Sequence, residues 1–307
     1  MTIKLNQPYS FSQLGKRSNQ EDSRFPASNC PLACDPFFIV CDGVGGEADG
    51  EVASRTVCQA MAKVLGRYDW SDRFTQNEFL RALDAAYQAL NTASRDASSD
   101  MATTLAFAAF HKGGCSMAYI GDSRIYQLRP GQGIIYRSDD HSLVNELVHA
   151  GVITPDEALT HPQRSTISRY MAPLVQKEER CQPTWFTTTD VRPGDSFLLC
   201  TDGVVDAVSD KMLERIICSP GNDEEKCQKL ARCCQGSDDN NTAYLISIAE
   251  VSVQPDENKS ATEDDEPLGQ TRRITGSQPK AVDMEATRKD YTLGERLTNF
   301  IKGKFNL

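Results

Sequence analysis

The chain has 307 residues, a formal net charge of -10 and a hydrophobic fraction of 39%, a composition typical of a soluble chain long enough to bury a core. No apolar run approaches the roughly 18 residues of a membrane span, and residues 1–6 lack the basic-then-apolar pattern of a secretory signal, so we expect a cytoplasmic protein. The acidic balance argues against binding to nucleic-acid phosphates, and eleven cysteines without an export signal argue against a disulfide framework.

Short apolar runs and helical stretches alternate along the first 251 residues. Four runs have the length and the turn-forming flanks of buried strands, two longer stretches place apolar residues on one helical face, and a third has helix-capping residues. The strands are expected at residues 37–41, 116–120, 197–201 and 243–249, and the helices at residues 51–68, 78–95 and 222–236. Two long helices follow the first strand and strands dominate afterwards, which favours a layered mixed fold over a regular parallel α/β alternation.

An aspartate lies near one end of every predicted strand. Asp42, Asp122 and Asp202 follow the first three strands, and Asp239 precedes the fourth. A single Asp-Gly pair would be read as a turn. Carboxylates at neighbouring strand ends, however, can come within a few ångströms of one another, and they repel strongly unless a cation lies among them. Because oxygen ligands of this kind suit Mg²⁺ or Mn²⁺ better than zinc, the pattern predicts a site for such a divalent cation.

Residues 15–22 add a basic group beside two more acids, Glu21 and Asp22. Two divalent cations about 3.5 to 4 Å apart can lower the pKa of a shared water and neutralise phosphoryl oxygens. The guanidinium of Arg17 would then hold the phosphate, because its planar fork matches a pair of phosphate oxygens. The combination indicates chemistry on a phosphate ester.

Eight segments, in this order, resemble the metal-dependent serine/threonine phosphatases of the PP2C (PPM) type, particularly the bacterial members. The segments read GKRSNQED, CDGVGGEADGEVAS, ATTLAFAAF, IGDSRIYQL, DDHSLVNELVHAGVIT, THPQR, LLCTDGVVDAVSD and DNNT. The resemblance covers residues 8–250, and the ordered series is far more specific than a DGxGG motif alone. It implies an α+β fold, a four-layer α-β-β-α sandwich with two central antiparallel β-sheets.

The resemblance also implies roles for individual residues. Asp42 corresponds to the carboxylate that bridges two metal ions, and it shares the catalytic role with Arg17, which matches the phosphate-binding arginine. The other matches are metal ligands and their supports: the Gly43 carbonyl on the second ion, Asp202 and Asp239 on the first, Asp22 with Glu21 as the acidic pair near the metals, Asp122 on a third and weaker ion, and Asn240 beside Asp239. The implied cofactor is Mn²⁺ or Mg²⁺, as two or three ions.

By this resemblance the protein hydrolyses phosphoserine and phosphothreonine by direct attack of a hydroxide that bridges two metal ions. Its partners would be phosphoproteins, a serine/threonine kinase or the targets of that kinase, and residues 140–170 match a flap that helps to choose substrates. Val44 departs from animal members, which carry a histidine there as a proposed general acid, so the source of the leaving-group proton stays open. The alternative is a catalytically inactive PP2C-like regulatory module that binds phosphoproteins.

Composition divides the chain into three parts. Residues 1–251 form the expected catalytic domain with a net charge of -9, residues 252–267 carry -5 and are typical of an acidic flexible linker, and residues 268–307 form a tail that carries +4. Within this tail, residues 291–305 place apolar side chains at helical spacing. Such a short amphipathic helix could dock on a partner or on an acidic membrane surface.

Overall fold

The computed structural model describes residues 1–44, 49–94, 101–173 and 180–252. Within these ranges there are two compact units, of which the larger holds residues 1–140 and 169–252 and the smaller holds residues 141–168. Apart from Ser252, the expected linker and tail lie outside the described residues.

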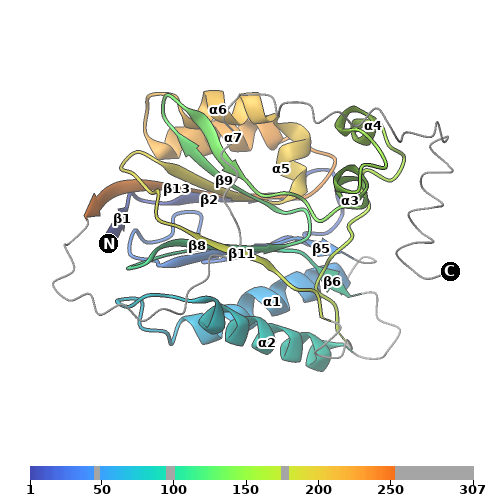
Figure 1. Ribbon diagram of the computed structural model, residues 1–307, viewed down its shortest axis with the longest axis horizontal. Coiled ribbons are helices and arrows are strands. Elements are labelled where there is room, and N and C mark those ends of the chain that lie inside the picture. The colour runs from blue at the N-terminus through green and yellow to red at the C-terminus, as the bar shows by residue number, and fades with distance from the viewer. Residues whose placement is uncertain (45–48, 95–100, 174–179, 253–307) are drawn as a thin grey trace, which may run out of the picture. The chain divides into compact units, whose positions relative to one another are not determined.

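The larger unit is built on two antiparallel sheets (Figure 1). The six-stranded sheet has the order β1 (Thr2–Leu5), β13 (Asn241–Ser252), β12 (Ser196–Cys200), β9 (Arg124–Arg129) and β10 (Gly133–Arg137), with β2 (Tyr9–Gln13) also paired to β13. The five-stranded sheet has the order β11 (Thr184–Thr188), β8 (Gly114–Ile120), β7 (Leu105–His111), β4 (Phe37–Cys41) and β3 (Ser23–Phe25). A separate short pair is formed by β5 (Gly43–Val44) and β6 (Ala102–Thr103).

Helices cover the outer face of each sheet, so that the larger unit has four layers (Figure 1). On the five-stranded sheet these are α1 (Asp49–Leu65) and α2 (Gln76–Ala93). On the six-stranded sheet they are α5 (Asp202–Ala207), α6 (Asp210–Ile217) and α7 (Asp223–Cys234). The arrangement confirms the expected α+β sandwich with two central antiparallel sheets.

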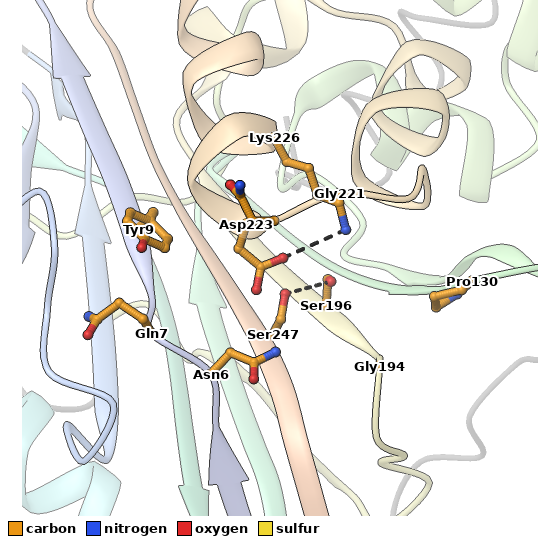
Figure 2. A pocket seen from close by; sticks show the side chains of 11 residues that line it. Asn6, Gln7, Tyr9, Pro130, Gly194, Ser196, Gly221, Asp223, Lys226 and Ser247 are labelled. Carbon is orange, nitrogen blue, oxygen red and sulfur yellow. Dashed lines mark hydrogen bonds and ion pairs between the residues drawn. The ribbon is translucent and has the colours of Figure 1, made fainter.

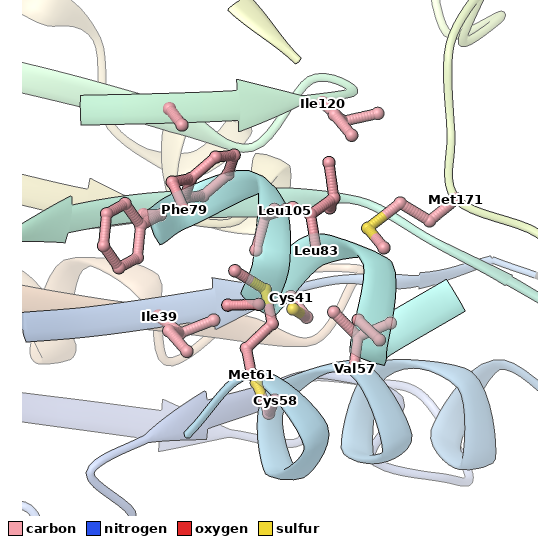
Figure 3. Packing of buried hydrophobic residues seen from close by; sticks show 14 of the residues in the cluster. Ile39, Cys41, Val57, Cys58, Met61, Phe79, Leu83, Leu105, Ile120 and Met171 are labelled. Carbon is pink, nitrogen blue, oxygen red and sulfur yellow. The ribbon is translucent and has the colours of Figure 1, made fainter. Parts of the chain in front are cut away.

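The strands read as continuous apolar runs because both of their faces are buried. In β4, Phe37, Ile39 and Cys41 pack against α1 and α2 in one core cluster (Figure 3), whereas Phe38 and Val40 belong to the cluster between the sheets. β12 alternates in the same way between the cluster between the sheets and the cluster beneath α5, α6 and α7. Burial on two sides fixes the register of each strand, and with it the position of the residues just beyond the strand.

The caps decide where the helices begin. α2 begins two residues before residue 78, because Thr75 and Glu78 form a capping box at its N-terminus. At the start of α7, the Asn222 side chain accepts a hydrogen bond from the Glu225 N–H at 2.7 Å, so this helix begins as the sequence predicted.

The smaller unit contains α3 (Leu143–His149) and α4 (Pro155–Leu159) and lies within residues 140–170, where the family resemblance predicts a flap. Val144, Leu147 and Ile153 form a small core of its own. Its two ends are joined by the Ser168 N–H, which donates to the His141 carbonyl at 2.8 Å.

Candidate metal and phosphate site

The predicted acids come together at strand ends of the larger unit. Asp42 follows β4, Asp122 lies in the loop from β8 to β9, Asp202 begins α5 just after β12, and Asp239 precedes β13. Asp42 lies within electrostatic reach of Asp22, Asp122 and Asp202, and Asp202 in turn lies within reach of Asp239. Five separate stretches of the sequence therefore meet in one acidic site.

The glycine after Asp42 and the glycine after Asp202 permit close backbone contacts. A Cβ atom on Gly43 would lie 2.2 Å from the Gly50 carbonyl oxygen, and one on Gly203 would lie 2.0 Å from the Asn240 carbonyl oxygen. Only glycine fits at such distances. These two Asp-Gly pairs are therefore sites of backbone approach, and the second brings the start of α5 against the start of β13.

Asn240 joins the segment before β13 to the segment before β3. Its Oδ1 accepts a hydrogen bond from the Glu21 N–H at 2.7 Å, and its Nδ2 donates to the carbonyls of Leu14 and Asn19 at 2.8 and 3.0 Å. Asn240 is only 3% exposed, so these bonds are shielded from water. The acidic pair at residues 21 and 22 is thereby fixed beside Asp239.

Buried hydroxyl groups hold the backbone of Asp42. The Asp42 N–H donates to Thr104 Oγ1 at 2.9 Å, and Thr103 Oγ1 donates to the Asp42 carbonyl at 2.8 Å. Thr104 Oγ1 also lies 2.6 Å from Ser123 Oγ, which connects it to the loop that carries Asp122. These hydroxyl residues lie within the motifs, but no role could be predicted for them, because their only signal is a set of hydroxyls beside buried apolar runs.

Arg17 is the basic group at the site. Its Nη2 lies 2.7 Å from Asp239 Oδ2, and its side chain is 55% exposed. The hydrogen bond and the charge of Asp239 raise the pKa of Arg17, so the guanidinium stays charged. Because this bond occupies one nitrogen of an exposed fork, other N–H groups remain to bind phosphate oxygens.

Burial raises the pKa values of the site carboxyls. Desolvation is the largest cause, and repulsion by neighbouring carboxylates adds to it. The pKa rises to about 7 for Asp22 and Asp122 and to about 6 for Asp202, and it rises well above its ordinary value for Asp42. Carboxyl groups that ionise this reluctantly are groups that a nearby cation would stabilise.

The donor atoms of the site fit a hard divalent cation. Asp22 Oδ1 and Asp202 Oδ1 are buried without a hydrogen-bond partner in the described part of the chain. Among the same residues, no three His, Cys, Asp or Glu side chains converge closely enough to enclose an ion by themselves. Mg²⁺ commonly takes one or two carboxylates and fills its other positions with water, so neighbours such as Asp202 and Asp239 suffice for such an ion.

Comparison with known proteins shows the family of the chain. A family model described as "Protein phosphatase 2C" matches residues 27–231. The chain belongs to the protein phosphatase 2C family. This confirms the family resemblance found in the sequence of this PP2C protein.

Two curated relatives are bacterial phosphatases. The serine/threonine protein phosphatase PstP of Mycobacterium tuberculosis is 33% identical over 237 residues, which cover 75% of this chain and 42% of the relative. The protein phosphatase PhpP of Streptococcus pneumoniae is 33% identical over 248 residues, which cover 78% of this chain and 96% of the relative. This PP2C protein thus matches less than half the length of PstP and nearly all of PhpP.

Solved structures agree with the fold, and one of them contains manganese. The crystal structure of PstP from Mycobacterium tuberculosis matches with a TM-score of 0.69 and 31% identity, covering 81% of this chain and 100% of that chain. A structure of the PstP catalytic domain in complex with two manganese ions matches with a TM-score of 0.67 and 29% identity, covering 81% and 100%. The PP2C family is metal-dependent, in line with the oxygen donors described above.

Two other features bear on the sequence-based expectations for this PP2C protein. In the part of the chain that the structure describes, no helix is both long and apolar enough to cross a membrane. All eleven cysteines are free thiols, and Cys227 lies within α7, where the sequence analysis expected a helix.

A hollow of about 430 Å³ lies at the start of β12 (Figure 2), whereas Asp202 lies just beyond the end of that strand. Ser196, at the start of β12, lines it and bonds to Ser247 with an Oγ–Oγ distance of 2.9 Å. Its charged groups are Lys226 and Asp223, which lie 3.7 Å apart. The predicted site residues lie elsewhere, so this hollow is separate from the candidate site.

Proposed function

We propose that this protein is a metal-dependent phosphatase that removes phosphate from phosphoserine and phosphothreonine in proteins. The observation that carries the proposal is the convergence of carboxylates from five stretches of sequence beside a charged arginine, with Arg17 Nη2 2.7 Å from Asp239 Oδ2. The phosphatases named among the relatives support it. When bound, Mn²⁺ or Mg²⁺ ions would supply a bridging hydroxide that attacks phosphorus directly.

The chain's own residues would hold the ions and orient the phosphate. Asp42 would contact both ions, with the Gly43 carbonyl on the second ion. The other ligands would be Asp202, Asp239 and Asp22, with Asp122 on a third ion and Glu21 and Asn240 in support. Arg17 would bind the phosphoryl oxygens and hold the ester in line for attack.

Further assignments belong to the same proposal. Residues 1–251 would form the catalytic domain, with a linker at residues 252–267 and a basic tail at residues 268–307. The substrates would be phosphoproteins in the cytoplasm, with a serine/threonine kinase or its targets as partners, and the segment 140–170 would help to select them. The tail would dock on a partner or on a membrane surface.

Replacing a metal-ligating carboxylate tests the activity. We expect Asp42→Asn and Asp202→Asn each to lower Mn²⁺-dependent hydrolysis of a phosphothreonine peptide by on the order of a hundredfold or more, because each loses a charged ligand. The folded state should persist, since the amide keeps the shape and relieves carboxylate repulsion. Rates of phosphate release and melting temperatures measure both effects.

The matched control is Asp206→Asn, an exposed aspartate on the same helix as Asp202. It should keep most of the wild-type rate. The proposal would be refuted if the wild-type protein bound Mn²⁺ but hydrolysed no phosphopeptide. It would also be refuted if hydrolysis continued after EDTA had removed the metal. The first of these results would instead favour a regulatory module that binds phosphoproteins, a reading that the five retained aspartates argue against.

Replacing the phosphate-binding group should change a different kinetic constant. We expect Arg17→Ala to raise the KM for a phosphopeptide about tenfold or more with kcat largely kept, because the arginine contacts the phosphate in both the bound and the reacting state. Lys16→Ala is the control, since Lys16 pairs with the exposed Asp238 at 2.7 Å. A fall in kcat at unchanged KM would contradict a role in substrate binding.

A further inference from the structure

The loop that carries Asp122 crosses from one sheet to the other. It follows β8 of the five-stranded sheet and leads into β9 of the six-stranded sheet, whose first residue is Arg124. On the five-stranded side, Ser123 Oγ lies 2.6 Å from Thr104 Oγ1. On the six-stranded side, Arg124 is paired in register with Cys200, the last residue of β12. Asp122 is therefore held between two anchors.

On the six-stranded side, Arg124 also forms a two-point ion pair with Asp140. Arg124 Nε donates to Asp140 Oδ1 at 2.7 Å, and Nη2 donates to Oδ2 at 2.6 Å, while Nη1 donates to the Tyr126 hydroxyl at 3.2 Å. The side chains of the pair are 23% and 16% exposed. Removing one partner from this partly buried pair leaves the other charge uncompensated.

Asp140 lies just beyond the end of strand pairing. β10 pairs with β9 as far as Arg137, and the Ser138 N–H donates to the Ile125 carbonyl at 2.9 Å. Asp140 is the last residue of the larger unit before the segment 141–168. The ion pair thus extends the attachment of the hairpin beyond its ladder of backbone hydrogen bonds.

Both charges of the pair act on Asp122. The carboxylate of Asp140 raises the pKa of Asp122 and the guanidinium of Arg124 lowers it, so both groups lie within its electrostatic reach. The guanidinium directs its hydrogen bonds to Asp140 and Tyr126. While the pair is intact, its two charges act on Asp122 in opposite directions.

We propose that Arg124 and Asp140 are positioning residues that keep Asp122 available to a divalent cation. The proposal rests on the proposed function, in which Asp122 holds the weakest of the ions. Without Arg124, the Asp140 carboxylate repels Asp122 and displaces it. Without Asp140, the guanidinium turns to Asp122 and takes the place of the cation. When both Arg124 and Asp140 are replaced by neutral residues, Asp122 is neither repelled by a carboxylate nor paired with a guanidinium.

Binding of Mn²⁺ to the full-length protein, followed by electron paramagnetic resonance of the free ion, tests this charge balance. We expect Arg124→Gln and Asp140→Asn each to weaken the weakest Mn²⁺ binding step about fivefold or more, and the double variant to return to within about twofold of wild type. In an Asp122→Asn background, which removes the ligand itself, neither substitution should change the remaining affinities.

Recovery in the double variant separates charge balance from a structural role. A double variant that binds Mn²⁺ as weakly as the single variants would show that the lost hydrogen bonds are what matter, and it would overturn the proposal. Single variants with wild-type affinity would also overturn it. Arg124→Lys keeps the positive charge but loses the planar guanidinium. It replaces Arg124→Gln in the test if that variant does not fold. It should bind within about threefold of wild type, and a loss as large as that expected for Arg124→Gln contradicts the proposal.

The pair between Arg137 and Asp210 supplies the matched control. Arg137 ends the second strand of the same hairpin and pairs with Asp210 of α6 at an N–O distance of 2.8 Å, and the two side chains are 40% and 39% exposed. Arg137→Gln should leave every Mn²⁺ affinity unchanged. Hydrolysis of p-nitrophenyl phosphate by the wild type, measured in parallel, separates the two proposals. Absent turnover defeats the proposed function, while the Mn²⁺ affinities still decide the role of the pair.

Discussion

Gly203 shows how little space the candidate site leaves between its elements. A Cβ atom there would lie 2.0 Å from the Asn240 carbonyl oxygen and 3.3 Å from Asp239 Cβ. We therefore expect Gly203→Ala to lower the free energy of unfolding by about 1 to 3 kcal/mol, because the start of α5 must move away from β13. The same movement separates Asp202 from Asp239, so Mn²⁺-dependent activity should fall further than stability alone explains. Urea unfolding and phosphopeptide hydrolysis measure the two effects.

Gly236, just beyond α7, is the matched control at the same scale. No atom lies within 4 Å of the Cβ position there. Gly236→Ala should change the free energy of unfolding by no more than about 0.5 kcal/mol. Equal losses in the two variants would mean that the close approach at Gly203 does not hold the site together.

At the scale of elements, His111 connects the segment between α1 and α2 to the hairpin of β7 and β8 through hydrogen bonds. Its Nδ1 accepts hydrogen bonds from the N–H groups of Phe74 and Gly113 at 3.2 and 3.0 Å, and its Nε2 lies 2.8 Å from Ser116 Oγ. A proton on Nδ1 would point at these two N–H donors, so this nitrogen stays unprotonated in the folded chain. The ring is 4% exposed. Burial, with a smaller contribution from the charge of Arg73, lowers its pKa to about 4.

This depressed pKa makes the stability depend on pH. In the unfolded chain the imidazole takes up a proton as the pH falls through about 6.5, whereas in the folded chain it does so only near pH 4. The contribution of His111 is thus fully present above pH 6.5 and is lost as the pH falls toward 4. We expect a loss of about 2 kcal/mol in the free energy of unfolding between pH 7.5 and 5.

Urea unfolding of the wild type and His111→Gln at both pH values isolates this contribution. Other groups titrate in the same range, and the difference between the two proteins removes their shared effect. The stability advantage of the wild type should shrink by about 2 kcal/mol at pH 5. Parallel pH dependence in the two proteins would show that His111 is not the group that titrates.

At the scale of the whole molecule, local sequence patterns predicted which aspartates belong to the site but not the strand arrangement that brings them together. Asp42, Asp202 and Asp239 could be found because each lies beside an uninterrupted apolar run. The order of the strands could not, because β13 pairs with β1, β2 and β12 across long stretches of sequence. Only the family resemblance supplied the four-layer sandwich. The contact between Thr104 and Ser123 depends on how β7 and β8 pair, and uncharged hydroxyls left no pattern to mark it.

The same long-range pairing indicates how much of the chain the activity needs. The last described residues of β13 pair with β1, with Ser252 opposite Thr2 and Val251 opposite Ile3. Every candidate site residue precedes β13. A protein that ends at residue 252 therefore keeps all of its described strands and every proposed ligand. We expect deletion of residues 253–307 to leave kcat/KM for a phosphopeptide within about twofold and to leave the melting temperature nearly unchanged.

A longer deletion provides the contrast. Ending the chain at residue 246 removes Ile248, a core residue opposite Leu5, together with all pairing between β13 and β1. That protein should unfold at a clearly lower temperature, because the edge of the six-stranded sheet loses both its ladder and its packing. Melting curves and phosphate release from the two truncated proteins and the full chain measure the difference. A protein that ends at residue 252 and is folded but inactive would place an essential part of the active site within residues 253–307.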